Sequence, residues 1–128
     1  MRSNAEIVVD VLERIGTRYV FGYPGGQNAR FIEAIHGSKT EFVLVTHEAC
    51  AGFMADVYGR LTGKPGACLS TLGPGATNMT TGVGNAFLDR VPCAFSAAAA
   101  AECRALPILV NRAPQTRFWT MLRSAPCD

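Results

Sequence analysis

Glu48 is the residue whose type and position in this sequence are best suited to chemistry. It lies two residues after the apolar run Phe42–Thr46, so we expect it at the carboxyl end of a strand, partly shielded from water. A carboxylate in such a place can exchange a proton or form a strong hydrogen bond with a ligand. A second interpretation fits equally well, in which Glu48 is an ordinary acidic residue in the first turn of a helix.

Two glycine-rich turns could bring a ligand close to the main chain. The first runs from Gly22 to Gly26, and the second from Gly73 to Asn78. Glycine permits close approach, and a helix that starts after the second turn offers free N–H groups. Thr77 and Asn78 add side-chain donors. The second turn is neither a P-loop nor a dinucleotide-binding fingerprint, and such turns are also plain connections between a strand and a helix.

The elements that must position these residues alternate along the chain. Periodicity and end signals predict helices over 3–15, 29–35, 48–61 and 76–88, and strands over 19–21, 42–46, 67–71 and 91–95. This alternation is typical of a parallel sheet flanked by helices, a three-layer α/β fold. Ligands gather at the carboxyl ends of such strands, where the turns 22–26, 47–49 and 72–78 are expected. The strand over 42–46 is continuously apolar, which predicts burial on both faces.

Composition sets limits on the class of protein. The sequence has 128 residues, of which 48% are hydrophobic and 17% charged, with a net charge of +2. These values favour one domain with its own core and do not indicate nucleic acid or a membrane surface as a partner. Five cysteines without a CxxC spacing favour reduced thiols in a cytoplasmic protein. His47 has no second histidine at helical spacing, so we expect no metal ligands.

Five short motifs, taken in order, resemble one protein family. They are FGYPGG (21–26), THEACA (46–51), YGRLTGKPG (58–66), GPGATN (73–78) and GNAFLDRVP (84–92). Together they resemble the N-terminal pyrimidine-binding domain of thiamine diphosphate enzymes of the acetolactate synthase type. The resemblance assigns residues 1–97 to that domain as a partial copy. Each motif alone is loose, whereas the five in sequence are specific.

The resemblance implies a cofactor and a role for Glu48. This carboxylate would hydrogen-bond the aminopyrimidine ring of thiamine diphosphate and favour its imino tautomer, while the cofactor serves as the electron sink for a 2-keto acid. The remaining cofactor-binding residues would come from the two glycine-rich turns: Pro24, Gly25 and Gly26 near the reacting centre, and Gly75, Thr77 and Asn78 beside the pyrimidine or a second subunit. Asn85 and Asp89 also match, but we interpret them as structural polar contacts.

The family's pattern also shows what this sequence does not contain. In the family a separate C-terminal domain holds the diphosphate and Mg²⁺ through a Gly-Asp-Gly motif, which does not occur here. The family's site lies between two subunits. We therefore expect half of a carboligase or decarboxylase site, inactive alone, with a homodimer or diphosphate-domain partner. Two alternatives are a non-catalytic α/β module that pairs with a separately encoded diphosphate domain, and an unrelated flavodoxin-like nucleotide binder.

Residues 98–128 depart from the family's pattern. The codons for Phe118 to Met121 can also be read in a neighbouring frame, which starts at the third base of the codon before Phe118. In that frame they encode Leu-Asp, the first two residues of a Leu-Asp-His segment in the family. We therefore hypothesise a frameshift between about Pro92 and about Arg117. Propensity favours a makeshift helix over Ala97 to Leu106, but the prolines that follow break it repeatedly. We therefore expect residues 98–128 to be poorly ordered. A sheet that stops after four strands would leave an apolar edge uncovered.

Overall fold

The computed structural model describes residues 2–98, 105–110 and 119–121. Its helices and strands alternate up to the fourth strand, and two further strands follow. In chain order the elements are α1 (Asn4–Arg14), β1 (Tyr19–Gly22), α2 (Ala29–His36), β2 (Glu41–Leu44), α3 (Glu48–Thr62), β3 (Gly66–Thr71), α4 (Pro74–Leu88), β4 (Cys93–Ala98), β5 (Ala105–Val110) and β6 (Trp119–Met121).

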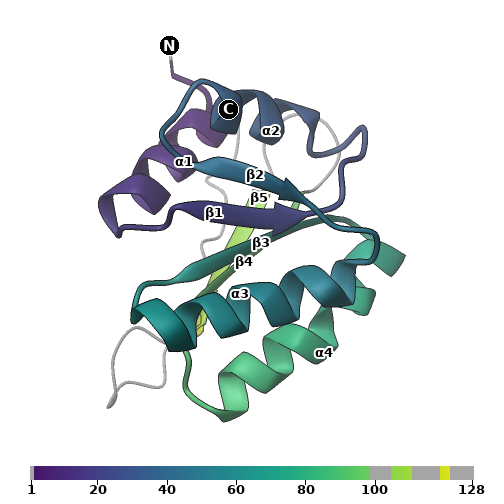
Figure 1. Ribbon diagram of the computed structural model, residues 1–128. Helices are drawn as coiled ribbons and strands as arrows, with labels where there is room; N and C mark the ends of the chain where they lie inside the picture. The colour runs from purple at the N-terminus through teal and green to yellow at the C-terminus, as the bar shows by residue number, and fades with distance from the viewer. Residues whose placement is uncertain (1, 99–104, 111–118, 122–128) are drawn as a thin grey trace.

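The strands form one sheet with helices on both faces. The order across the sheet is β2-β1-β3-β4-β5-β6, and the first four strands are parallel. Helices α1 and α2 cover one face, while α3 and α4 cover the other (Figure 1). This arrangement confirms the predicted three-layer α/β fold. The helix predicted over 76–88 begins earlier, at Pro74, because proline is well tolerated in a first helical turn.

The prediction that the strand over 42–46 is buried on both faces is wrong. The strand β2 spans Glu41–Leu44 and lies at the edge of the sheet, where it pairs with no described strand other than β1. Leu44 is 64% exposed. An apolar run indicates that a strand has buried contacts, but it does not encode how many neighbouring strands it has.

The helix predicted over Ala97 to Leu106 is wrong at both ends, and the edge of β4 is not uncovered. Ala97 and Ala98 belong to β4, and Ala105 and Leu106 belong to β5, which pairs antiparallel with β4. The unpaired main-chain groups along β4 offer a full ladder of hydrogen bonds, which outweighs the helix propensity of alanine. The predicted disorder falls largely on residues 99–104, 111–118 and 122–128, which lie outside the described residues.

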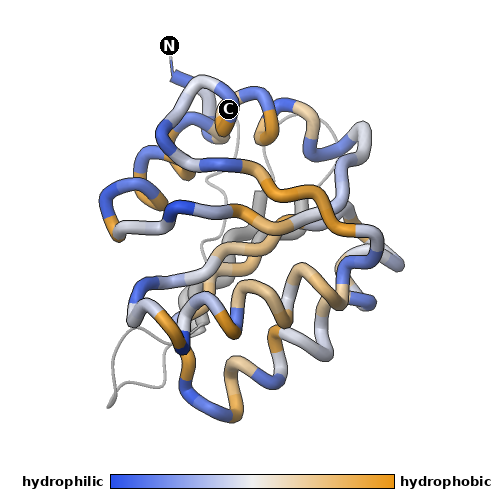
Figure 2. Tube along the Cα trace, in the orientation of Figure 1, coloured by the Kyte–Doolittle hydropathy of each residue, from blue (hydrophilic) through white to orange (hydrophobic). Residues whose placement is uncertain are grey.

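Two hydrophobic clusters hold the layers together, one on each face of the sheet. Successive residues of one strand point to opposite clusters: Val20 packs towards α1 and α2, whereas Phe21 packs towards α3 and α4. Figure 2 shows hydrophobic residues concentrated along the strands. The helix α1 begins with a capping box between Ser3 and Glu6, which satisfies main-chain N–H groups at its start.

Two cysteines belong to the core of the sheet. Cys68 and Cys93 are buried free thiols, whereas Cys50 is exposed. A hydrogen bond with Cys93 and burial away from water raise the pKa of the Cys68 thiol well above its usual value. Cys68 therefore stays protonated near neutral pH and behaves as a small apolar core residue.

An apolar stripe lies on the outer side of α3. It consists of Phe53, Met54, Val57 and Leu61, and Leu61 alone is 81% exposed. Together with Phe21 and Tyr58 these residues line an open groove of about 400 Å³. Among the described residues, no helix is long and apolar enough to cross a membrane.

Candidate cofactor-binding site

The two glycine-rich turns meet at the carboxyl edge of the sheet, because β1 and β3 are neighbours. Thr71 ends β3 and lies between them. A Cβ atom built on Gly25 would lie 2.5 Å from Thr71 Cγ2, and one built on Gly75 would lie 2.7 Å from Thr71 Oγ1. The main-chain N–H of Leu72 also donates to Gln27 Oε1 at 3.1 Å. Both turns therefore pack closely against the Thr71 side chain, and glycine at these two positions avoids crowding it.

The side chain of Asn28 holds the first turn in shape. Asn28 is 1% exposed. Its Oδ1 accepts from the main-chain N–H of Gly25 at 2.8 Å, and its Nδ2 donates to the carbonyl of Tyr23 at 3.0 Å. Asn28 was not among the residues predicted from the sequence to form the site. Its signal was an asparagine just before a predicted helix, a residue type that organises turns through its side chain.

Glu48 is the first residue of α3 and lies beside the second glycine-rich turn. His47 caps the helix, with its Nδ1 accepting from the N–H of Ala49 at 3.2 Å. Asn78 Nδ2 donates to Glu48 Oε2 at 3.2 Å. The other oxygen, Oε1, would lie 3.3 Å from a Cβ atom on Gly75. Glu48 is half-buried as a residue, but the hydrogen bond of its carboxylate with Asn78 is exposed to solvent. It is thus both a first-turn residue and part of the convergent edge.

This geometry suits a flat heteroaromatic ring that donates a hydrogen bond. In the part of the chain that the structure describes, Asn78 is the one donor to the Glu48 carboxylate. Among the same residues, the other carboxylate oxygen, Oε1, accepts no hydrogen bond and faces Gly75. A ring nitrogen or amino group could donate to Oε1 there, and a charged acceptor makes such a bond strong. Within the same residues, no three His, Cys, Asp or Glu side chains gather in a group that could hold a metal ion.

Three other predicted cofactor-binding residues lie at this edge but make no contact with the Glu48 carboxylate among the described residues. Pro24 and Gly26 are exposed in the first turn, and a Cβ atom on Gly26 would meet nothing within 4 Å. Thr77 is exposed, and its hydroxyl donates to the carbonyl of Pro74 at 3.0 Å. The Thr77 hydroxyl therefore turns towards the start of its own helix.

The helices α3 and α4 run side by side and in the same direction. Facing residues 29 or 30 positions apart meet about once per helical turn. These pairs, here called the α3–α4 ladder, are Glu48 with Asn78, Gly52 with Gly82, Asp56 with Asn85, and Arg60 with Asp89. The first pair of the ladder belongs to the candidate site, and the other three set the separation and register of the helices.

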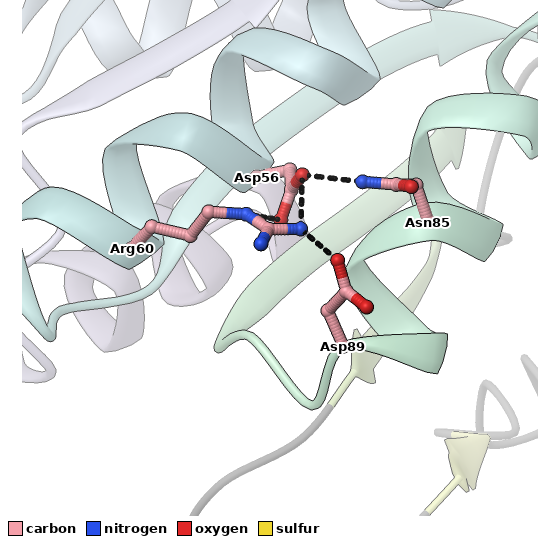
Figure 3. A network of polar contacts seen from close by, with 4 residues as sticks. All are labelled: Asp56, Arg60, Asn85 and Asp89. Atoms are coloured by element: carbon pink, nitrogen blue, oxygen red, sulfur yellow. Dashed lines mark hydrogen bonds and ion pairs between the residues drawn. The ribbon is translucent and has the colours of Figure 1, made fainter.

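A polar network joins the last two pairs of the ladder (Figure 3). Asp56 is only 2% exposed. Its carboxylate accepts two hydrogen bonds from Arg60 at 3.0 Å each, and one from Asn85 at 2.7 Å. Arg60 also pairs with Asp89. Hydrogen bonds with Asp56 and then Asp89 raise the pKa of Arg60 above its usual value, so its charge is permanent. These contacts confirm the structural interpretation of Asn85 and Asp89.

The two carboxylates of this network are expected to differ in their effect on stability. Replacing Asp56 by asparagine should lower the free energy of unfolding by about 2 kcal/mol, because it removes a buried charge that three donors require. Asp89→Asn should cost less than about 1 kcal/mol, since Asp89 is half exposed. Urea denaturation of both variants measures the difference. Equal losses would contradict the view that Asp56 is the centre of the network.

Comparisons with known proteins identify a family. The family described as "Thiamine pyrophosphate enzyme, N-terminal TPP binding domain" matches residues 2–105. An acetolactate synthase of Arthrospira platensis is 45% identical over 94 residues, which cover 70% of this chain and 16% of the relative. The acetolactate synthase large subunit of Haemophilus influenzae is 52% identical over 91 residues, with 70% and 16% covered.

A plant protein is similar to a comparable extent. Acetolactate synthase 3 of Brassica napus, a chloroplastic protein, is 47% identical over 92 residues, or 71% of this chain and 14% of the relative. The chain thus spans about a sixth of the length of these curated relatives. Because the family matches most of the sequence, and the fold is the expected parallel α/β sheet, the chain belongs to the thiamine pyrophosphate enzymes, as an N-terminal TPP binding domain.

Proposed function

We propose that this chain binds the aminopyrimidine half of thiamine diphosphate through Glu48. The observation that carries the proposal is the position of the Glu48 carboxylate beside Gly75: Asn78 donates to Oε2, while Oε1 accepts no hydrogen bond from the described residues. Gly25 and Thr71 would form the floor against which the flat ring packs. Glu48 would accept a hydrogen bond from the ring, and its carboxylate would favour the ring tautomer that can donate to it.

We further propose that the chain supplies one half of a carboligase or decarboxylase site for 2-keto acids, like that of acetolactate synthase. The bound cofactor would supply the electron sink for that chemistry. The diphosphate and Mg²⁺ would be held by a partner, either a second subunit or a separately encoded diphosphate-binding domain. The apolar stripe on α3 supports a partner, since exposed apolar surface of this kind is typical of an interaction face.

A titration tests the proposal. Because only the pyrimidine half of the site is expected here, thiamine and thiamine diphosphate should bind with affinities within about threefold of each other, in the millimolar range. Both should perturb the amide signals of Glu48 and Gly75 in NMR spectra. Pyruvate, thiamine diphosphate and Mg²⁺ together should give no turnover by the chain alone.

Three outcomes of this titration would count against the proposal. Binding of flavin mononucleotide in place of thiamine would support the flavodoxin-like alternative instead. Perturbed signals confined to α1 and α2, on the other face of the sheet, would move the site away from Glu48. Turnover of pyruvate by the isolated chain would show that it holds more than half of an active site.

A further inference from the structure

We infer that Asn78 is a positioning residue, which holds Glu48 Oε2 so that Oε1 is the oxygen presented to the ligand. This inference rests on the proposed function and deepens it. The resemblance places Asn78 among residues that would lie beside the cofactor. The contacts instead assign its amide to the carboxylate.

The two oxygens of Glu48 are not equivalent. Asn78 Nδ2 donates to Oε2 at 3.2 Å, whereas Oε1 faces Gly75 and accepts no hydrogen bond from the described residues. The amide can face the carboxylate only with its NH₂ group, because its own oxygen would be repelled by Oε2. An amide that makes this bond has one N–H directed at Glu48, so its first effect on a ligand is through the orientation of that carboxylate.

The fold holds Asn78 in this position. The next residue, Met79, is completely buried, which sets the rotation of α4 about its own axis. One turn further along, Gly52 and Gly82 are in close contact: a Cβ atom on Gly82 would lie 2.6 Å from the carbonyl carbon of Gly52. The helices are therefore near enough at this level for a short amide side chain to span the gap to Glu48.

Substitutions at position 78 can separate positioning from direct binding. Asn78→Ala removes the donor, and we expect thiamine to bind about fivefold more weakly, the cost of one hydrogen bond. Asn78→Asp keeps the shape but places a second negative charge against Glu48. If Asn78 acts through Glu48, this variant should be weaker still, by at least tenfold. Direct contact predicts the opposite, because thiamine is a cation and an added carboxylate would attract it.

The test combines two measurements on the full chain, with Thr81→Ala as a matched control on the exposed side of α4. The first follows thiamine binding by NMR for the wild type, N78A, N78D and T81A; T81A should bind like the wild type. The second follows the side-chain amide signals of Asn78 without ligand. These signals should shift upfield in E48A and remain in place in a Glu33→Ala variant, which changes an exposed residue on α2.

Each outcome decides a separate statement. If the Asn78 amide signals are the same in E48A as in the wild type, Asn78 does not hold Glu48. If N78D binds thiamine as tightly as N78A or more tightly, Asn78 contacts the ligand directly. Either result overturns the inference. A wild-type chain that binds no thiamine, with the amide signals still responding to E48A, would overturn the proposed function and the ligand-directed part of the inference. The contact between the two side chains would then stand as a structural one.

Discussion

Replacing Glu48 by glutamine is expected to lower the affinity for thiamine by about 10- to 100-fold. Glutamine has nearly the same shape, but its neutral amide oxygen is a weaker acceptor than a carboxylate. A hydrogen bond to a charged group contributes about 1.5–3 kcal/mol, which corresponds to that range of affinity. The measurement is a titration of the wild type and E48Q with thiamine at neutral pH, followed by chemical-shift changes.

Glu33→Gln is the matched control for this prediction. Glu33 is an exposed residue of α2, on the other face of the sheet, so this variant removes the same charge without touching the site. It should bind thiamine as the wild type does. Circular dichroism should show the same helix content for all three proteins, since Glu48 makes a single side-chain hydrogen bond, with Asn78, among the described residues. Equal affinities of E48Q and the wild type would remove the basis of the proposed function.

Replacing Gly66 by alanine is expected to give the largest loss of stability in the described part of the chain. Gly66 begins β3 directly beneath α3. A Cβ atom there would lie 2.1 Å from the carbonyl oxygen of Ala55 and 2.7 Å from its Cα. These are main-chain atoms of a packed helix, so relief requires the helix and the strand to separate. Overpacking of this kind costs about 3 kcal/mol or more, and the free energy of unfolding in urea measures it.

Gly84→Ala provides a control of opposite sign. Gly84 lies in α4, and a Cβ atom there would meet nothing within 4 Å. Alanine at an open helical position should stabilise the chain by about 0.5–1 kcal/mol, because it restricts the unfolded chain and favours the helix. A G66A variant as stable as the wild type would show that α3 does not lie as close to β3 as described.

The sequence allowed prediction of those features that depend on local pattern and on parallel topology. The helical spacing of apolar residues predicted all four helices to within a few residues. The alternation of strands and helices along the chain predicted that Glu48 and the glycine-rich turns lie together, because parallel strands end at the same edge of a sheet. The sequence does not indicate whether a strand lies at the edge or in the centre of the sheet. For this reason β2 was wrongly expected to be buried on both faces.

Features that depend on distant partners were missed for a physical reason. Asp56 is buried because Asn85 and Asp89 approach its ion pair from another helix. The i, i+4 spacing of Asp56 and Arg60 was visible in the sequence as a helical ion pair, but its burial was not. Likewise, the pairing of Asn78 with Glu48 depends on how close two glycines allow the helices to come.

The α3–α4 ladder has a consequence for how force passes through the molecule. Its first contact holds the proposed ligand-binding carboxylate, and its last lies three turns away, about 16 Å along the helix axis. Because every turn between them is tied by a steric or ionic contact, neither helix can slide against the other without breaking several contacts at once. We therefore expect the two helices to shift together rather than separately, which links the candidate site to the loop before β4.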